Sequence, residues 1–351
     1  MTALDYAIER ARNVDLLDLA RRYVKLEKIA ANEHAGPCPG CGGDDVLETF
    51  TPAGLLSGTP NKEKEKGATG GVLKKIGAFG IMLFKDFGSV IELRTEQRGE
   101  MMAALRRIYD GEYTRQVGAG GGKTLPWKGK AGCLFGATQA YDQHHAVSGT
   151  LGDRFLLYRI ETMVDEQLMM SRLRPGAVTD MRQRLASAVA DLFASLPDPL
   201  PEPTTMNDPE YASLSDVIRI VIKLRGGVIR DRIRREIDDV LDPEGPGRLV
   251  LALQQLFAGF RLIGVDRKEA ATLVEQIAYD SVPKLRLKAF NALTHDWQKT
   301  RDVANTIKLP TTTTKRALED LMAQGLALRD EDEDDDKGGQ TGGAHRWKLA
   351  P

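Results

Sequence analysis

The chain has 351 residues, 42% of them hydrophobic and 28% charged, which is the balance of a soluble globular protein. This length predicts two or three domains rather than a single core. With 49 basic and 50 acidic residues the net charge is −1, which excludes the uniformly basic surface of proteins that bind nucleic acid indiscriminately. Any DNA contact must therefore come from a local patch.

The sequence carries no sign of membrane insertion or secretion. No apolar run approaches the roughly 20 residues that cross a bilayer. Charged side chains occur throughout residues 1–12, where a signal peptide would be apolar. The three cysteines make no disulfide framework. We therefore expect a cytoplasmic protein with no membrane partner.

The first 45 residues combine a helix with a cysteine turn. Apolar residues spaced three or four apart predict a helix over 4–31, and a short loop then contains Cys38-Pro-Gly-Cys41. Glycine lets such a turn point both thiolates at one ion, as in a zinc knuckle. His34 is a candidate third ligand, whereas a second Cys-x-x-Cys pair is absent from the sequence. Residues 1–45 resemble the start of the zinc-binding domain of phage-type DNA primases, which implies Zn²⁺; a metal-free turn with two free thiols stays open.

Residues 46–195 alternate strand-like and helix-like patterns, which favours an α/β layer. Compact apolar runs bounded by glycine and charge indicate buried strands, and a glycine-rich turn between two short strand patterns indicates a β-hairpin. The expected elements are strands at 80–84, 131–137 and 154–160, a helix at 95–110, and a hairpin of strands 113–117 and 124–128.

Lys85 and Asp86 directly follow the expected strand at 80–84. A carboxylate at the carboxyl end of a buried strand has the form of a Walker B element, which holds Mg²⁺ where open α/β sheets bind their ligands. The sequence therefore makes both residues candidates for binding a nucleotide and its metal ion.

Further motifs around this element lie at residues 55–59, 70–77, 108–111, 136–138 and 152–159. With them, the chain from about residue 47 onward resembles a family of helicase-like AAA+ ATPases of phages and mobile elements. This resemblance implies ATP and Mg²⁺ as cofactors and a homo-oligomeric ring. It implies that Thr138 senses the γ-phosphate and that Arg154 is an arginine finger supplied to a neighbouring subunit. A salt bridge from Arg154 to Asp153 or to another carboxylate is the alternative.

The sequence lacks the phosphate loop of such ATPases. A Walker A motif, G-x-x-x-x-G-K-[ST], stands between a strand and a helix and precedes the Walker B strand. Residues 118–124 come closest, but Val117 occupies the position of the first glycine and a hairpin strand follows in place of a helix. We therefore expect an incomplete AAA+-like core with impaired or no ATP hydrolysis, in an internally shortened version of a longer primase/helicase-type protein.

A proline-rich linker at residues 196–212, with five prolines, precedes a helical part of the chain. Apolar spacing predicts an all-α, lid-like region over 213–294. Its most basic stretch, residues 219–235, is expected to be an exposed helix face, with a DNA path or an ATPase-lid arginine as alternatives. The expected helices span about 213–240, 246–263, 267–279 and 281–294.

Residues 295–351 predict two short helices and two strands. Thr300 can cap the first helix, and Leu309-Pro310 breaks the chain after it. A second helix over 315–324 follows a run of four threonines and ends at Gly325. Two helices joined by a tight turn form a helix-turn-helix, whose second helix enters the major groove with its N-terminal residues on bases and phosphates.

Strands at 326–329 and 346–349 would pair as a wing beside these helices. The stretch resembles the winged-helix domains of transcription regulators and replication proteins. Because the acidic run at residues 330–336 would repel phosphate, a winged helix that contacts protein instead of DNA stays open. The candidate DNA-binding residues are Thr311, Thr312, Thr313, Lys315, Arg316 and Arg346.

These patterns together predict a DNA-binding, replication-type protein of a phage or mobile element. It would join an incomplete AAA+-like α/β core to a helical lid and a C-terminal winged helix-turn-helix. Two alternatives stay open: an active AAA+ ATPase or helicase, and a non-enzymatic winged-helix regulator or assembly subunit.

Overall fold

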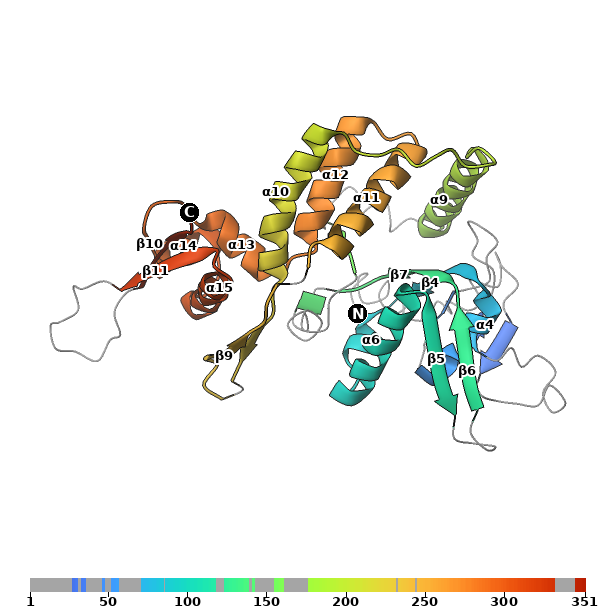
Figure 1. The fold of residues 1–351 in the computed structure, drawn as a ribbon, viewed down its shortest axis with the longest axis horizontal. Coiled ribbons are helices and arrows are strands. Elements are labelled where there is room, and N and C mark those ends of the chain that lie inside the picture. The colour runs from blue at the N-terminus through green and yellow to red at the C-terminus, as the bar shows by residue number, and fades with distance from the viewer. Residues whose placement is uncertain are drawn as a thin grey trace. The chain divides into compact units, whose positions relative to one another are not determined.

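The chain folds into helices and small sheets in a computed structural model, in agreement with a mixed α/β composition (Figure 1). Residues 1–141 with 162–198 form one compact unit, and residues 142–161 with 199–351 form the other. Cys38, Cys41, Lys85 and Arg154 lie outside the described part of the chain. The described residues are 27–30, 33–35, 46–47, 52–56, 71–84, 86–117, 123–138, 141–142, 155–160, 176–231, 233–243, 245–331 and 345–351.

The first unit contains a three-stranded parallel sheet. Its order is β3 (Val46–Leu47), β4 (Phe79–Phe84) and β7 (Lys130–Phe135), with β4 in the middle. Phe84 lies opposite Phe135 at the carboxyl ends of β4 and β7. The two expected strands are thus confirmed, and their two faces differ in burial: Met82 is fully buried, whereas Ile81 on the other face is 54% exposed.

Helix α6 (Thr95–Tyr109) packs against β5 and β7 and confirms the helix expected at 95–110. Its apolar residues recur three or four apart, so they share one face of the helix. The buried residues on that face are Met101, Met102, Ala104, Leu105 and Ile108. The other helices of this unit are α3 (Pro52–Leu55), α4 (Val72–Ile76), α5 (Gly88–Ile91) and α9 (Ala177–Ala194).

The expected β-hairpin is confirmed as β5 (Glu112–Val117) and β6 (Lys123–Lys128). Buried Tyr113 and Trp127 face each other across the two strands. The Trp127 Nε1–H donates a hydrogen bond of 2.7 Å to the carbonyl oxygen of Gly77. This bond fastens the hairpin to the turn that precedes β4.

Gly129, between β6 and β7, lies close to the backbone of the turn before β4 and to the Trp127 ring. A Cβ atom there would lie 2.6 Å from the Ala78 carbonyl oxygen and 2.7 Å from Trp127 Cζ2. We therefore expect Gly129→Ala to lower the free energy of unfolding by about 1–3 kcal/mol, the usual cost of overpacking. Gly99→Ala is the matched control in urea titrations. Gly99 lies inside α6 with nothing within 4 Å of the added Cβ, so this change should stabilise by about 0.5–1 kcal/mol.

Two expectations for the secondary structure of residues 1–160 are wrong. The helix expected to reach residue 31 is replaced over Glu27–Ala30 by β1, which pairs with β2 (Glu33–Ala35). The strand expected at 154–160 is absent from the described residues 155–160. There the Leu157 amide donates to Ser281 Oγ at 2.8 Å, and the Arg159 amide donates to Asp280 Oδ2 at 2.9 Å. Side chains at the end of a helix thus take the backbone hydrogen bonds that a sheet would have taken.

The larger segment of the second unit, residues 199–351, starts with four helices: α10 (Asp208–Arg225), α11 (Gly247–Leu262), α12 (Arg267–Asp280) and α13 (Lys284–Ala292). Helix α10 starts where Asn207 and Glu210 form a capping box. It ends at Arg225 because Gly226 and Gly227 follow, so the helix expected through residue 240 is wrong. The chain forms instead an antiparallel hairpin, β8 (Val228–Arg230) and β9 (Ile237–Val240). The region expected to be all-α therefore contains a β-hairpin.

The C-terminal residues form two helices and a three-stranded sheet. The helices are α14 (Thr300–Ile307) and α15 (Thr311–Ala323). Strands β11 (Ala327–Glu331) and β12 (His345–Leu349) confirm the expected strand pair. A third, unexpected strand, β10 (Gln298–Lys299), lies on the other side of β12.

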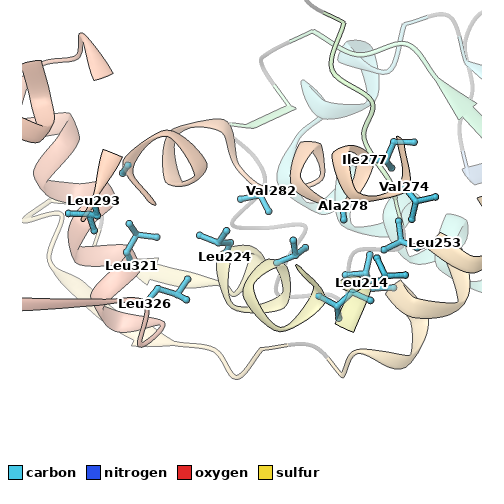
Figure 2. Packing of buried hydrophobic residues seen from close by; sticks show 14 of the residues in the cluster. Leu214, Leu224, Leu253, Val274, Ile277, Ala278, Val282, Leu293, Leu321 and Leu326 are labelled. Atoms are coloured by element: carbon cyan, nitrogen blue, oxygen red, sulfur yellow. The ribbon is translucent and has the colours of Figure 1, made fainter. Parts of the chain in front are cut away.

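One hydrophobic core runs through the whole second unit (Figure 2). It joins Leu214 of α10, Leu253 of α11 and Val274 of α12 to Leu321 of α15 and Trp347 of β12. The C-terminal helices are therefore packed on the helices before them as one body. In the described part of the chain, no helix combines the length and apolar character needed to span a membrane.

Candidate nucleic-acid interface

Helices α14 and α15 are joined by a tight turn. Lys308 ends α14 in the left-handed conformation with φ of 55°. The Leu309 amide then donates 3.1 Å back to the Ala304 carbonyl oxygen, which closes the helix end. Pro310 occupies the N-cap position of α15 and makes no side-chain cap, while both the amide and the hydroxyl of Thr314 donate to its carbonyl oxygen, at 3.0 and 3.1 Å.

The expected DNA-binding residues of α15 differ in exposure. Thr311, Thr312 and Arg316 are exposed, whereas Thr313 and Lys315 are half-buried. The opposite face of the helix packs into the core through Ala317, Leu318 and Leu321. Helix α15 therefore presents a polar and basic N-terminal half to the exterior of its unit.

The N-terminus of α15 has no side-chain cap and no acidic residue in its first turn. The first amides of a helix carry a partial positive charge and lack partners within the helix, so they attract anions. A phosphate is the anion that this arrangement suits best, because Lys315 and Arg316 add full positive charges next to it. Within the described residues, neither of these side chains has an ion-pair partner.

Arg346, the remaining candidate, is held in the sheet. It lies half-buried on β12, opposite Lys299 of β10 and Asp330 of β11. The sheet thus places a carboxylate directly across from this arginine. Arg346 is therefore less available to a phosphate than Arg316.

Trp347, next to Arg346, anchors the sheet to α14. Its indole is fully buried and donates a 2.9 Å hydrogen bond to Thr300 Oγ1, and the Thr300 hydroxyl donates 3.2 Å to the His345 carbonyl oxygen. Thr300 is the first helical residue, with Lys299 at the cap position. The expectation that Thr300 caps the helix is therefore wrong, because its hydroxyl bonds the sheet instead.

Two arginines outside the C-terminal segment hold the inner face of α15. Arg230 of β8 pairs with Asp320 at 2.7 Å and with Glu319 at 3.0 Å. Arg286 of α13 donates from Nε to the other Asp320 oxygen at 3.1 Å. Burial alone would lower the pKa of Arg230, but the hydrogen bond and charge of Asp320, helped by Glu319, raise it. The guanidinium therefore stays charged at any physiological pH.

Sequence reasoning missed this ion-pair cluster. Arg230 lies in the basic stretch that was expected to be an exposed helix face, yet its side chain is only 16% exposed. The double glycine at Gly226 and Gly227 was the available signal that the helix stops before it. Nothing in the sequence shows that Asp320 lies between two arginines from other elements.

In the first unit, the expected nucleotide-binding residues lie at the carboxyl edge of the parallel sheet. Asp86 follows β4, and its Oδ1 accepts the Gly88 amide at 2.8 Å. Thr138 follows β7 in the same direction and is exposed. The Phe87 amide donates 2.7 Å to the Gly136 carbonyl oxygen, which joins the two segments beyond the strands. The structure thus brings Asp86 and Thr138 to one edge, where open α/β sheets bind ligands.

Three packed phenylalanines support this edge. The ring of Phe135 lies 4.8 Å from that of Phe84 and 4.4 Å from that of Phe87, between ring centroids. Phe84 and Phe87 are both buried. Their packing fixes the backbone on either side of Asp86.

The segment closest to a phosphate loop has the wrong surroundings for one. Lys123 and Thr124 lie in strand β6, opposite Val117 and Gln116. The Thr124 hydroxyl donates 2.8 Å to the side-chain carbonyl of Gln116. A phosphate loop needs the start of a helix after it, whereas a strand follows here.

The expected zinc ligands are mostly beyond the described residues. His34 lies in β2, paired with Lys28 of β1, while Cys38 and Cys41 lie outside. Within the described ranges, no three residues of metal-binding type cluster together. Cys133 is a free thiol in β7, and burial raises its pKa to about 12, so it stays protonated and packs as an apolar residue.

Comparison of the chain with protein-family models, with curated proteins and with solved structures finds no match.

Proposed function

We propose that this chain binds duplex DNA through a C-terminal winged helix, residues 295–351, with α15 in the major groove. The observation that carries the proposal is the uncapped N-terminus of α15, with Thr311, Thr312 and Arg316 exposed around it. The order helix, turn, helix and antiparallel strand pair supports a winged helix-turn-helix. The ion pairs from Arg230 and Arg286 support it, because a helix that reads a groove must be rigid.

The rest of the chain fits a replication-type protein of a phage or mobile element with an incomplete AAA+-like core. Asp86 and Thr138 at the carboxyl edge of the sheet support a site for Mg²⁺ and a nucleotide. In this proposal Lys85 contacts the nucleotide, and Arg154 reaches a neighbouring subunit of a homo-oligomer. Cys38, Cys41 and His34 would hold Zn²⁺ in a primase-like N-terminal segment.

DNA binding is tested by Lys315→Ala/Arg316→Ala in the full chain. Each lost phosphate contact changes the slope of log affinity against log salt by about 0.9. We expect the slope for duplex DNA to fall by about two and the affinity at 0.1 M salt to fall about 60-fold, since each contact contributes a factor of about eight there. Arg248→Ala is the control, because Arg248 is an exposed arginine on α11. An unchanged slope in the double variant would refute groove binding by α15.

ATP hydrolysis is expected to be very poor, with or without DNA. Without the lysine and the backbone amides of a phosphate loop, the groups that bind the β- and γ-phosphates are missing, although Asp86 could still hold Mg²⁺. The measurement is release of phosphate by pure protein over hours, with and without duplex DNA. Robust DNA-stimulated turnover that Asp86→Asn abolishes would instead establish the active ATPase.

The rival proposal is a regulator or assembly subunit that uses the winged helix on protein. The acidic residues 330–336 favour it, because they repel phosphate; the first two, Asp330 and Glu331, are the last residues of β11. Replacing the seven acidic residues at 330–336 by Ser/Gly separates the two proposals. A DNA-binding wing should gain affinity for duplex DNA, and a protein-binding wing should show no duplex affinity before or after the change.

A further inference from the structure

The β8–β9 hairpin ends in a turn with a defined backbone. The Asp231 carboxylate accepts the amides of Ile233 and Arg234, at 2.8 and 2.5 Å. The Asp231 amide donates to the Glu236 carbonyl oxygen at 2.9 Å, which closes the base of the turn. Arg235 adopts a φ of 63°, a conformation that a non-glycine residue rarely takes. The turn is therefore built by specific contacts.

The tip of this hairpin carries an unusual combination of side chains. Ile233 is 90% exposed, more than any other large hydrophobic residue of the described chain. Arg234 and Arg235 beside it are exposed, and neither side chain has a hydrogen-bond or ion-pair partner within the described residues. In sequence Arg232 adds a further positive charge. An apolar side chain held in water among arginines serves no purpose in the packing of this unit.

The hairpin is tied to α15 through Arg230. Besides its ion pairs with Glu319 and Asp320, Arg230 donates 2.9 Å to the carbonyl oxygen of Arg316 and 2.8 Å to that of Arg235. One guanidinium thus joins the tip of the hairpin to the helix proposed to read DNA. Figure 1 shows the hairpin, labelled at β9, as an arm that extends beyond the helices of its unit.

Charge is divided along the hairpin. The arginines at the tip outnumber the acidic residues there, Asp231 and Glu236, whereas β9 carries only the acidic Asp238 and Asp239, with Asp239 opposite Ile229. A polyanion would therefore meet the positive end of the arm first.

From these observations we infer that the tip of the β8–β9 hairpin is a second DNA contact. Arg234 and Arg235 pair with phosphates, and Ile233 wedges against a base step, as apolar side chains do in proteins that kink duplexes. This inference rests on the proposed function, because it places the tip on the same duplex that α15 binds. Since Arg230 joins the hairpin to α15, these two elements contact the duplex at a fixed distance from each other.

Arg234→Ala/Arg235→Ala in the full chain tests the phosphate contacts. We expect the salt slope for duplex DNA to fall by about two and the affinity at 0.1 M salt to fall about 60-fold. Both side chains are exposed and unpartnered, so the midpoint of thermal unfolding should not change. Arg248→Ala should leave the affinity and the slope as they are in the unaltered protein.

Two changes at Ile233 test the wedge. Ile233→Ala should weaken duplex binding without a change in salt slope, because it removes an apolar contact and no charge. Ile233→Trp should bind with quenching of tryptophan fluorescence beyond that of the unaltered protein, because the indole stacks on a base.

The outcomes separate this inference from the proposed function. One outcome is that Lys315→Ala/Arg316→Ala weakens binding while the hairpin variants bind as the unaltered protein does. The DNA contact of the hairpin is then refuted, and an acidic protein becomes the expected partner of its tip. If only the hairpin variants weaken binding, the hairpin contact stands and the placement of α15 is wrong. If the unaltered protein has no affinity for duplex DNA, both are overturned.

Discussion

Trp347→Ala is expected to lower the free energy of unfolding of the second unit by about 4 kcal/mol, in the range for truncating a buried tryptophan. Trp347 is fully buried at the end of the core that joins the sheet to α15. Its loss leaves a cavity and also removes the hydrogen bond to Thr300. The measurement is urea unfolding followed by far-ultraviolet circular dichroism.

Trp297 supplies the matched control for this change. Its side chain is 40% exposed, and Lys348 Nζ lies 4.6 Å from its ring centroid. Trp297→Ala should cost less, about 1–2 kcal/mol, since its side chain is only partly buried and its cation–π contact is exposed to water. Equal losses in the two variants would mean that Trp347 is not part of the core.

Asp320→Ala is expected to lower the free energy of unfolding by about 3 kcal/mol, because it leaves two largely buried guanidinium groups without their shared carboxylate. The side chains of Arg286 and Arg230 are 8% and 16% exposed, so little water can compensate. Arg230 still pairs with Glu319 in this variant. The expected loss of free energy of unfolding is therefore at the lower end of the range for broken buried ion pairs. The change is measured by urea unfolding at neutral pH.

An exposed pair of the same residue types is the control for this cluster. Asp216 and Arg219 on α10 lie 3.4 Å apart, with side chains 76% and 79% exposed. Exposed ion pairs are screened by water and salt, so Asp216→Ala should not measurably change stability. If Asp320→Ala also left the free energy of unfolding unchanged, the proposed support of α15 by this carboxylate would be refuted.

The sequence predicted those helices and strands whose apolar residues recur at the spacing of that element. The apolar face of α6 and the strand pattern of β4 both follow from residues close together in the chain. The double glycine at Gly226 and Gly227 marked a helix end, yet the periodicity of the residues around it suggested a longer helix. Strand β10, two residues long, carries no pattern of its own and exists only because β12 pairs with it.

The candidate site likewise has features that the sequence predicted and features that it did not. The α14–turn–α15 arrangement was predictable, because Leu309-Pro310 and the four threonines mark the turn and the helix start. The support of α15 was not, because Arg230 lies 90 positions before Asp320 and only the fold brings them together. The role of Thr300 was misjudged for the same reason, since its partner Trp347 is 47 positions away.

These features give a consistent physical account of the second unit. A buried core and an ion-pair cluster fix α15 and the β8–β9 hairpin, and both elements leave basic side chains exposed. In the first unit Asp86 lies at the carboxyl edge of the parallel sheet, and the sequence contains no Walker A motif. We propose that these exposed basic side chains of the second unit bind duplex DNA.

The most direct measurement is photo-crosslinking from position 312, with a photoreactive amino acid in place of Thr312 and a 5′-labelled DNA duplex. Position 248, also exposed in the same unit, is the control. We expect a covalent protein–DNA product from position 312 that disappears as salt is raised, and none from position 248. A duplex that binds the protein but crosslinks from neither position, or equally from both, would contradict the placement of α15 on DNA.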